Sequence, residues 1–427
     1  MLIENQFFNV IIGGCMKKEL KSVWIISKYG STKKYGVSSK PYRTAKFLSE
    51  NGINTYLISS DSNHLAEYPK SEHRYNWENE GELNHIWIKT LKYKKSASIK
   101  RVFSWLAFEW HLFRMDKRKL QRPDAVIISS LSLLTVLYGL YLKKIYKSKL
   151  VFEIRDIYPL TLTEELGVSK YNPIVWLFKI IERVGYKESD IIVGTMPNLS
   201  SHVKNVLGYE KKVFYSPLGI NDNWDLMRAP SKRVDELFPD HSCIVIGYAG
   251  SMGTTNALDS FIETIEYLQS DNELYFVLVG QGDQKEEYQN RLKNCRNVTV
   301  GPKLEQYEIP YFLSKCDILY LSTNDSKVWE YGQSMNKLVD YMKAGKPVVA
   351  SYSGYPSMLN EADSGIFVNT NSTEAIIEGI RKYANMDTEG RQEIGTKGKR
   401  WIEENYANEV VCKKYFDELC DLISFKE

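Results

Sequence analysis

Residues 244–253 read IVIGYAGSMG, an apolar run that ends in two glycines three positions apart. A run that is apolar throughout predicts a strand buried on both faces, as in a parallel sheet. Glycines directly after such a strand allow a tight turn into a following helix. The stretch therefore predicts the first strand and turn of an α/β domain.

The same pattern repeats on both sides of this stretch. Strands alternating with helices indicate a parallel sheet covered on both faces. Two successive series predict an α/β chain of two Rossmann-like, doubly wound parallel-sheet domains. Toward the C-terminus, apolar runs lie at 274–279, 297–300, 318–321, 347–350 and 366–368. Toward the N-terminus they lie at 22–27, 54–59, 125–129, 150–154 and 191–194, with helices expected at 41–51 and 131–145.

The chain has 427 residues, of which 43% are apolar and 26% charged. This composition is typical of soluble globular proteins and argues against a disordered, collagen-like or disulfide-stapled class. We expect a leader of doubtful structure at 1–20, an N-terminal domain at 21–222, and a C-terminal domain at 223–405. A C-terminal helix is expected at 406–427, and the linker near 217–230. No Lys or Arg precedes the apolar residues of the leader, so a signal peptide is not predicted, and both Met1 and Met16 are open as translation starts.

Charge is distributed unevenly. Residues 1–220 hold 34 Lys/Arg and 20 Asp/Glu, whereas residues 221–427 hold 22 Lys/Arg and 33 Asp/Glu. Residues 89–122 alone hold eleven basic and two acidic residues, interleaved with Phe103, Trp105, Phe108, Trp110 and Phe113. This mixture favours peripheral contact with the inner face of a cytoplasmic membrane. The alternative is a solvated helical hairpin whose aromatic rings face the core. No nucleic-acid motif accompanies the charge, so a nucleic-acid partner is not expected.

The six cysteines form no CxxC pair, which favours the reducing cytoplasm over a disulfide framework. No apolar run approaches the length of about 18 residues that a membrane span needs. No Asp-x-Asp pair occurs either, so we predict a site without a metal.

Residues 331–350, YGQSMNKLVDYMKAGKPVVA, are the most informative for function. Ser334 is expected to cap a short helix, with Gly345 at its end. Lys337 then falls in the first turn, where a cation is unfavourable unless an anion such as phosphate is bound. Asp340 lies on the same face of this helix as Lys337, and its carboxylate oxygens can accept hydrogen bonds from the hydroxyls of a ribose. The alternative is an ordinary surface Lys–Asp pair.

This segment resembles the donor-binding signature of family 4 glycosyltransferases, retaining enzymes of GT-B fold that use nucleotide sugars. The resemblance extends over nearly all of residues 22–420. It is closest to the branch that builds bacterial surface polysaccharides and includes the N-acetylfucosaminyl transferases. Residues 151–159 (VFEIRDIYP) resemble the acidic-aromatic-proline loop of that branch, residues 248–253 (YAGSMG) its phosphate loop, and residues 344–349 (AGKPVV) a widespread family motif.

The resemblance assigns expected roles to particular residues. Lys337, Asp156 and Arg155 are the catalytic candidates. Tyr35, Gly36 and Arg43 are the acceptor-binding candidates, and no metal ligand is expected. The donor-binding candidates are Gly250, Ser251, Met252, Gly253, Gly282, Pro302, Ser334, Asn336, Lys337 and Asp340.

Two positions depart from the family pattern. The family commonly has two glutamates eight positions apart, where this chain has Gly332 and Asp340. Its usual Arg/Lys pair after the first glycine loop is replaced by Thr254, Thr255 and Asn256. Lys337 would then have to supply the cation for the donor's diphosphate.

The resulting prediction is a retaining, metal-independent hexosyl or N-acetylhexosaminyl transferase. Two α/β domains facing a central cleft would bind a UDP-linked sugar and a lipid-linked saccharide acceptor, in O-antigen or capsule biosynthesis, without a further cofactor. By resemblance, the C-terminal helix crosses back onto the N-terminal domain. The alternatives are a sugar-nucleotide 2-epimerase of GT-B type and a catalytically silent saccharide-binding or assembly module.

Overall fold

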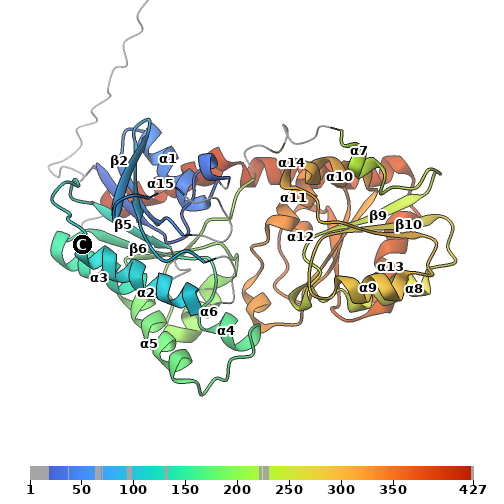
Figure 1. The fold of residues 1–427 in the computed structure, drawn as a ribbon, viewed down its shortest axis with the longest axis horizontal. Helices are drawn as coiled ribbons and strands as arrows, with labels where there is room; N and C mark the ends of the chain where they lie inside the picture. The colour runs from blue at the N-terminus through green and yellow to red at the C-terminus, as the bar shows by residue number, and fades with distance from the viewer. Residues whose placement is uncertain are drawn as a thin grey trace, which may run out of the picture.

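The computed structural model describes residues 19–36, 38–62, 69, 71–93, 99–129, 133–220, 224 and 230–424. These residues form two α/β domains that lie side by side and are bridged along one edge by the last helices of the chain (Figure 1). Residues 1–18 of the expected leader, with Met16, and most of the expected linker lie outside the described residues.

The N-terminal domain is built on an eight-stranded sheet. All neighbouring strands pair in parallel except the edge pair, β3 with β4. In spatial order the strands are β3 (Tyr75–Glu80), β4 (Leu83–Ile88), β2 (Asn54–Ser60), β1 (Ser22–Ile26), β5 (Ala125–Ser129), β6 (Lys149–Ile154), β7 (Ile191–Gly194) and β8 (Val213–Tyr215).

Helices cover both faces of this sheet, because its central strands are apolar on both sides. In β1, Trp24 and Ile26 join the core under α2, α3, α5 and α6, whereas Val23 and Ile25 join the core under α1 and the last helix, α15 (Asn408–Ser424). The helices of this domain are η1 (Lys33–Tyr35), α1 (Lys40–Glu50), α2 (Ile99–Arg114), α3 (Thr135–Tyr146), α4 (Leu160–Glu164), α5 (Pro173–Glu188) and α6 (Leu199–Leu207).

The C-terminal domain is built on a fully parallel six-stranded sheet. In spatial order its strands are β11 (Val298–Gly301), β10 (Leu274–Val279), β9 (Ile244–Ala249), β12 (Ile318–Ser322), β13 (Val348–Ser351) and β14 (Gly365–Val368). One core lies under α8 (Asp259–Tyr267), α9 (Lys285–Leu292) and α13 (Thr373–Ala384). The other lies under α10 (Ile309–Lys315), α11 (Asn336–Ala344), α12 (Leu359–Ala362) and α14 (Thr388–Tyr406). Short helices complete the domain: α7 (Lys232–Asp235), η3 (Thr254–Asn256), η4 (Gln306–Glu308) and η5 (Lys327–Tyr331).

The predicted fold class is confirmed, and every predicted strand is present with ends that agree to within one residue. The sequence reading missed β3, β4 and β8. The reason is clearest for β3, whose sequence YNWENE is mostly polar and none of whose residues is buried at the sheet edge, so it lacks the apolar run of a buried strand. It also pairs antiparallel to β4, so the sheet is not parallel throughout as predicted.

Two consecutive helices join the domains. α14 packs on α11 in the C-terminal domain, and α15 (Asn408–Ser424) packs on α1 in the N-terminal domain. Tyr415, Leu419 and Ile423 of α15 are buried in the core beneath that sheet. Where the two helices meet, the Asn408 side-chain amide donates to the Ile220 carbonyl at 2.7 Å. The C-terminal helix is therefore part of the N-terminal domain.

A buried ion pair lies beneath α15. The Lys40 amine is 3.0 Å from a Glu153 oxygen, and both side chains are 3% exposed. The ring of Tyr415 lies 4.8 Å from the same amine. We expect Lys40→Met to lower the free energy of unfolding by about 3–5 kcal/mol, because it leaves the Glu153 charge buried without its cation. The double change Lys40→Met/Glu153→Gln should recover part of this loss. Denaturant titration checks both, and a single variant as stable as the native chain would contradict the account.

Candidate active site

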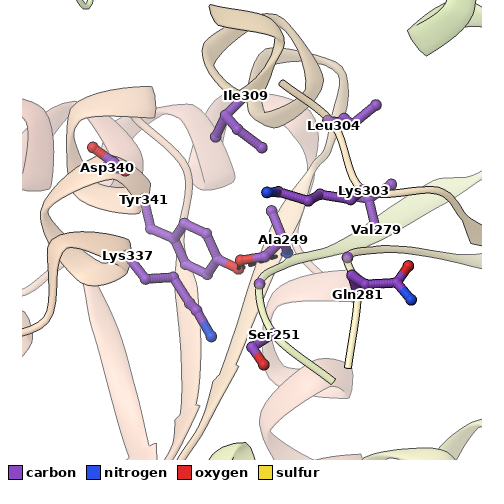
Figure 2. A pocket seen from close by; sticks show the side chains of 12 residues that line it. Ala249, Ser251, Val279, Gln281, Lys303, Leu304, Ile309, Lys337, Asp340 and Tyr341 are labelled. Carbon is purple, nitrogen blue, oxygen red and sulfur yellow. Dashed lines mark hydrogen bonds between the residues drawn. The ribbon is translucent and has the colours of Figure 1, made fainter. Parts of the chain in front are cut away.

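A cavity of about 520 Å³ opens at the carboxyl ends of β9 and β10, beside α11 (Figure 2). Open parallel sheets bind their ligands at this edge. Ala249 ends β9 and is followed by Gly250 and Ser251, whereas Val279 ends β10 and is followed by Gly280 and Gln281. The rest of the lining is Lys303, Leu304 and Ile309 from the segment after β11, and Lys337, Asp340 and Tyr341 from α11.

Glycines let the two loops after β9 and β10 approach each other closely. A Cβ on Gly280 would lie 1.8 Å from the Gly250 carbonyl oxygen, and one on Gly282 would lie 2.1 Å from that of Met252. The amides of Gly250 and Met252 donate to Val279 and Gln281 across this contact, at 3.0 and 3.1 Å. Among the described hydrogen bonds, the amides of Ser251 and Gly253 in the first of these loops donate to nothing, and Ser251 lines the cavity, so this loop can donate to an anion.

The Lys337 amine points at the first of these loops (Figure 2). A Cβ on Gly250 would lie 2.5 Å from it. It donates to Asn256 Oδ1 at 3.0 Å and to the Tyr248 hydroxyl at 3.2 Å, and it lies 4.5 Å from the centre of the Tyr248 ring. No carboxylate of the described residues forms an ion pair with it. Burial lowers the pKa of Lys337 to about 8. The arrangement is a cation held in a cavity without an anionic partner.

Two tyrosines that the sequence reading did not single out fix this geometry. The Tyr341 hydroxyl accepts from the Ala249 amide at 2.9 Å and donates to the Ala249 carbonyl at 3.3 Å, so it holds the end of β9 against α11. The Tyr248 hydroxyl donates to the Ser251 carbonyl at 2.6 Å while accepting from Lys337. Tyr341 lies four residues after Lys337, and this helical spacing is the signal that could have found it.

Asp340 lies at another edge of the cavity, apart from the Lys337 amine (Figure 2). Burial raises the pKa of its carboxyl to about 7. Lys303 extends into the cavity from the opposite wall (Figure 2). The cavity is thus lined by a carboxyl at one edge and by two amines on other walls, groups that suit a ligand carrying both hydroxyls and phosphates.

Of the predicted donor residues, the structure brings Gly250, Ser251, Lys337 and Asp340 together around this cavity. The others do not line it, although Gly253 belongs to the same loop as Gly250 and Ser251. Met252 is buried in the core beneath α8, and Gly282 supports the loop contact described above. Pro302 and Asn336 are exposed and do not line the cavity, whereas the neighbours of Pro302, Lys303 and Leu304, do. Ser334 lines a separate small cavity between the domains, with Thr195 and Tyr406.

The segment before α11 docks on the N-terminal domain. The Tyr331 side chain enters the N-terminal core, 4.8 Å from the His202 ring. The Asn198 amide donates to the Tyr331 carbonyl at 3.0 Å. Gly332 has φ +95°, and a Cβ there would lie 2.5 Å from a ring carbon of Pro197. The predicted capping role of Ser334 is wrong, because Met335 holds the cap position and no side chain caps the helix.

The N-terminal candidates for acceptor binding occupy different surroundings. The Tyr35 hydroxyl donates to Glu78 at 3.0 Å, and Gly36 ends η1 with φ +89°. The Arg43 guanidinium donates to the carbonyls of Ser38 and Leu218, so it ties α1 to the segment leading to the C-terminal domain. Tyr35 and Arg43 therefore have structural partners in this state.

Arg155 and Asp156 follow β6 at the carboxyl edge of the N-terminal sheet. Burial raises the pKa of the Asp156 carboxyl, although the charges of Arg155 and Arg101 oppose the shift. A buried carboxyl beside two guanidinium groups is a candidate for positioning a hydroxyl.

Two kinds of feature are absent from the described part of the chain. It holds no group of three or more His, Cys, Asp or Glu side chains arranged for a metal ion. None of its helices combines the length and apolar character needed to cross a bilayer.

Comparison with known proteins connects this site to a class. Residues 243–385 match the family described as Glycosyl transferases group 1. No curated protein sequence matches the chain. Among solved structures, a sucrose-phosphate synthase from Thermosynechococcus elongatus is similar with a TM-score of 0.70 and 12% identity, over 95% of this chain and 99% of that one. A UDP-forming α,α-trehalose-phosphate synthase from Burkholderia xenovorans has a TM-score of 0.63 and 11% identity, over 94% and 99%. HepE from Anabaena, in complex with UDP and glucose, has a TM-score of 0.60 and 10% identity, over 94% and 100%.

The chain therefore has the two-domain GT-B architecture of these glycosyltransferases. Its C-terminal domain, which contains the cavity, is a glycosyl transferase group 1 domain.

Proposed function

We propose that the protein is a retaining glycosyltransferase that takes a sugar from a nucleoside-diphosphate donor. The observation that carries the proposal is the Lys337 amine, directed at the Gly250 loop without an anionic partner among the described residues. Buried cations are normally paired, and a diphosphate would provide the missing charge. The group 1 domain around the cavity supports the same ligand.

The roles follow from the cavity's chemistry. Lys337 and the free amides of Ser251 and Gly253 hold the diphosphate and stabilise the negative charge that develops as it leaves. The Asp340 carboxylate accepts the hydroxyls of the ribose. By family resemblance, the acceptor hydroxyl attacks the face that the leaving group vacates, and the departing phosphate oxygen takes its proton. No metal or nucleophilic side chain is required in this scheme.

For the acceptor, we propose a lipid-linked saccharide of bacterial surface polysaccharide, as made by the branch that includes the N-acetylfucosaminyl transferases. Asp156 and Arg155 would orient its hydroxyl, and the region of Tyr35, Gly36 and Arg43 would bind the remainder. Segment 89–122 would place the enzyme at the cytoplasmic face of the membrane.

A screen of nucleotide sugars against membrane lipid extract tests the proposal, with product linkage determined by NMR. Transfer to lipid with retained anomeric configuration is expected. A labelled donor that isomerises without an acceptor would instead identify a 2-epimerase. Donor binding by calorimetry with no turnover of any donor would identify a silent module.

Donor affinity should depend on pH in a bell-shaped way. In the empty cavity burial disfavours both charged forms, so Asp340 has a pKa of about 7 and Lys337 of about 8. The donor requires both charges. Its affinity should therefore rise as pH increases toward 7, where Asp340 ionises, and fall above 8, where Lys337 loses its proton, by up to about tenfold per pH unit.

Calorimetric titration of UDP across this range checks the profile. In Asp340→Asn, UDP affinity should no longer rise between acid pH and pH 7, but it should still fall above pH 8. An alkaline decline that is unchanged in Lys337→Met would assign the titration to another group.

A further inference from the structure

Helices α2, α3 and α5 leave an apolar outer surface on the N-terminal domain, which we call the aromatic face. α3 packs against both α2 and α5, so the three helices form one continuous layer (Figure 1). Twelve of the twenty large apolar side chains exposed in the described residues lie on them. Six of these define the face: Phe103, Trp110, Phe113, Tyr141, Ile174 and Trp176.

This exposure is unusual for a soluble surface. Trp110 and Trp176 are 60% and 66% exposed, on two different helices. The described part of the C-terminal domain exposes only three large apolar side chains, all tyrosines: Tyr267, Tyr307 and Tyr355. A contiguous apolar surface of this kind marks a binding face.

The charge on the three helices indicates what binds there. They carry eight lysines and arginines but only three acidic residues. Two of the acids, Glu109 and Glu182, are buried beneath the helices. Glu188, at the end of α5, is the only acid of these helices left at the surface. The partner should therefore combine an apolar interior with a negatively charged surface.

The geometry points to an anionic lipid bilayer as the partner of the aromatic face. Tryptophan and phenylalanine rings enter the interfacial zone, and the surrounding lysines and arginines contact the headgroups. The three helices lie on one side of the domain, so they can meet a flat surface together. This inference rests on the proposed function and deepens it, since it states how the enzyme reaches an acceptor that resides in a membrane.

The face differs from the segment that the sequence reading selected. Within 89–122, Phe108 is buried in the core and the Trp105 indole donates to the Tyr29 hydroxyl at 2.6 Å, so neither is free to enter a membrane. α3 and α5, which contribute Tyr141, Ile174 and Trp176, lie outside that segment.

One edge of the face adjoins the boundary between the domains. Tyr171, 83% exposed, lies in the connection between α4 and α5, and α4 packs against η5 of the C-terminal domain. η5 leads directly into the segment before α11. A bilayer against this face would therefore lie next to the boundary between the two domains.

Vesicle flotation of the full-length chain tests the inference. Vesicles of phosphatidylcholine with phosphatidylglycerol should bind the protein, whereas pure phosphatidylcholine vesicles should bind it much more weakly. The double variant Trp110→Ser/Trp176→Ser should lower the bound fraction at least about tenfold. The matched control Tyr267→Ser/Tyr307→Ser, on the C-terminal domain, should bind as the native chain does. UDP calorimetry on all three proteins reports the donor site separately and should show no change.

Three results would overturn the inference. The first is that the native chain fails to bind anionic vesicles. The second is that the double tryptophan variant binds them as the native chain does. The third is a native dimer in gel filtration without lipid that is lost in the tryptophan variant, which would assign the face to a second copy and its acidic C-terminal half. If vesicle binding fails but UDP binds, only this inference is lost; if UDP fails to bind while vesicles do, the proposed function is lost.

Discussion

Replacing Lys337 by methionine should reduce sugar transfer by about a hundredfold or more, the scale observed when one preorganised electrostatic group is removed. The amine is the only side-chain cation directed at the Gly250 loop among the described residues that line the cavity. Without it, the leaving diphosphate would lose the one side-chain cation that is directed at this loop. UDP affinity should fall as well, because ground-state binding uses the same contact.

The same substitution should not destabilise the fold. The lowered pKa of Lys337 means that its charge is unfavourable in the empty cavity, so an apolar side chain of similar length should unfold at the same temperature or higher. Lys382→Met is the matched control, since Lys382 lies over the ring of Tyr383 at 5.5 Å in the same domain but away from the cavity. Transfer rates near the native value in the Lys337 variant would remove this residue from the mechanism.

Replacing Gly332 by glutamate, which restores the acid that the family commonly has there, should abolish activity rather than improve it. With φ +95° and ψ 176°, Gly332 occupies a backbone region that is essentially restricted to glycine. Any Cβ would also meet the ring of Pro197, across the contact that docks the C-terminal domain on the N-terminal domain. Strain and overpacking together should lower the free energy of unfolding by about 2–5 kcal/mol.

Smaller substitutions separate the two causes. Gly208→Ala is the control for a positive φ without a clash, because Gly208 has φ +84° and ψ 4°, in the left-handed helical region, and no neighbour within 4 Å of its Cβ position. It should cost about 1 kcal/mol. Gly332→Ala should cost more, and adding Pro197→Ala should recover part of the difference. Denaturant titration measures all four variants. A Gly332→Glu variant that is stable and more active would contradict the assigned packing.

The fold could be predicted largely from the strands, because central strands covered on both faces must be apolar throughout. β5, β7, β9 and β10 begin and end where their apolar runs do. β3 could not be found in this way, since an edge strand with one solvated face is free to be polar.

The site was predictable where a residue conflicts with its local surroundings. Lys337 stands out because a cation in the first turn of a helix opposes the helix dipole. Tyr341 is harder to identify. Its spacing from Lys337 places it on the same side of the helix, but a tyrosine on an amphipathic helix is usually part of the core, and its bond to Ala249 depends on how α11 packs on β9. The contact of Gly332 with Pro197 joins residues far apart in sequence, and neither residue by itself indicates that the other is its neighbour in the fold.

A crystal structure of the full-length chain with UDP is the most direct test of the nucleotide site. We expect the diphosphate within hydrogen-bond distance of the Lys337 amine and of the Ser251 and Gly253 amides, with ribose hydroxyls on Asp340. Density for UDP at another location, with the Lys337 amine still bonded only to Asn256 and Tyr248, would contradict the assignment of this cavity to the donor.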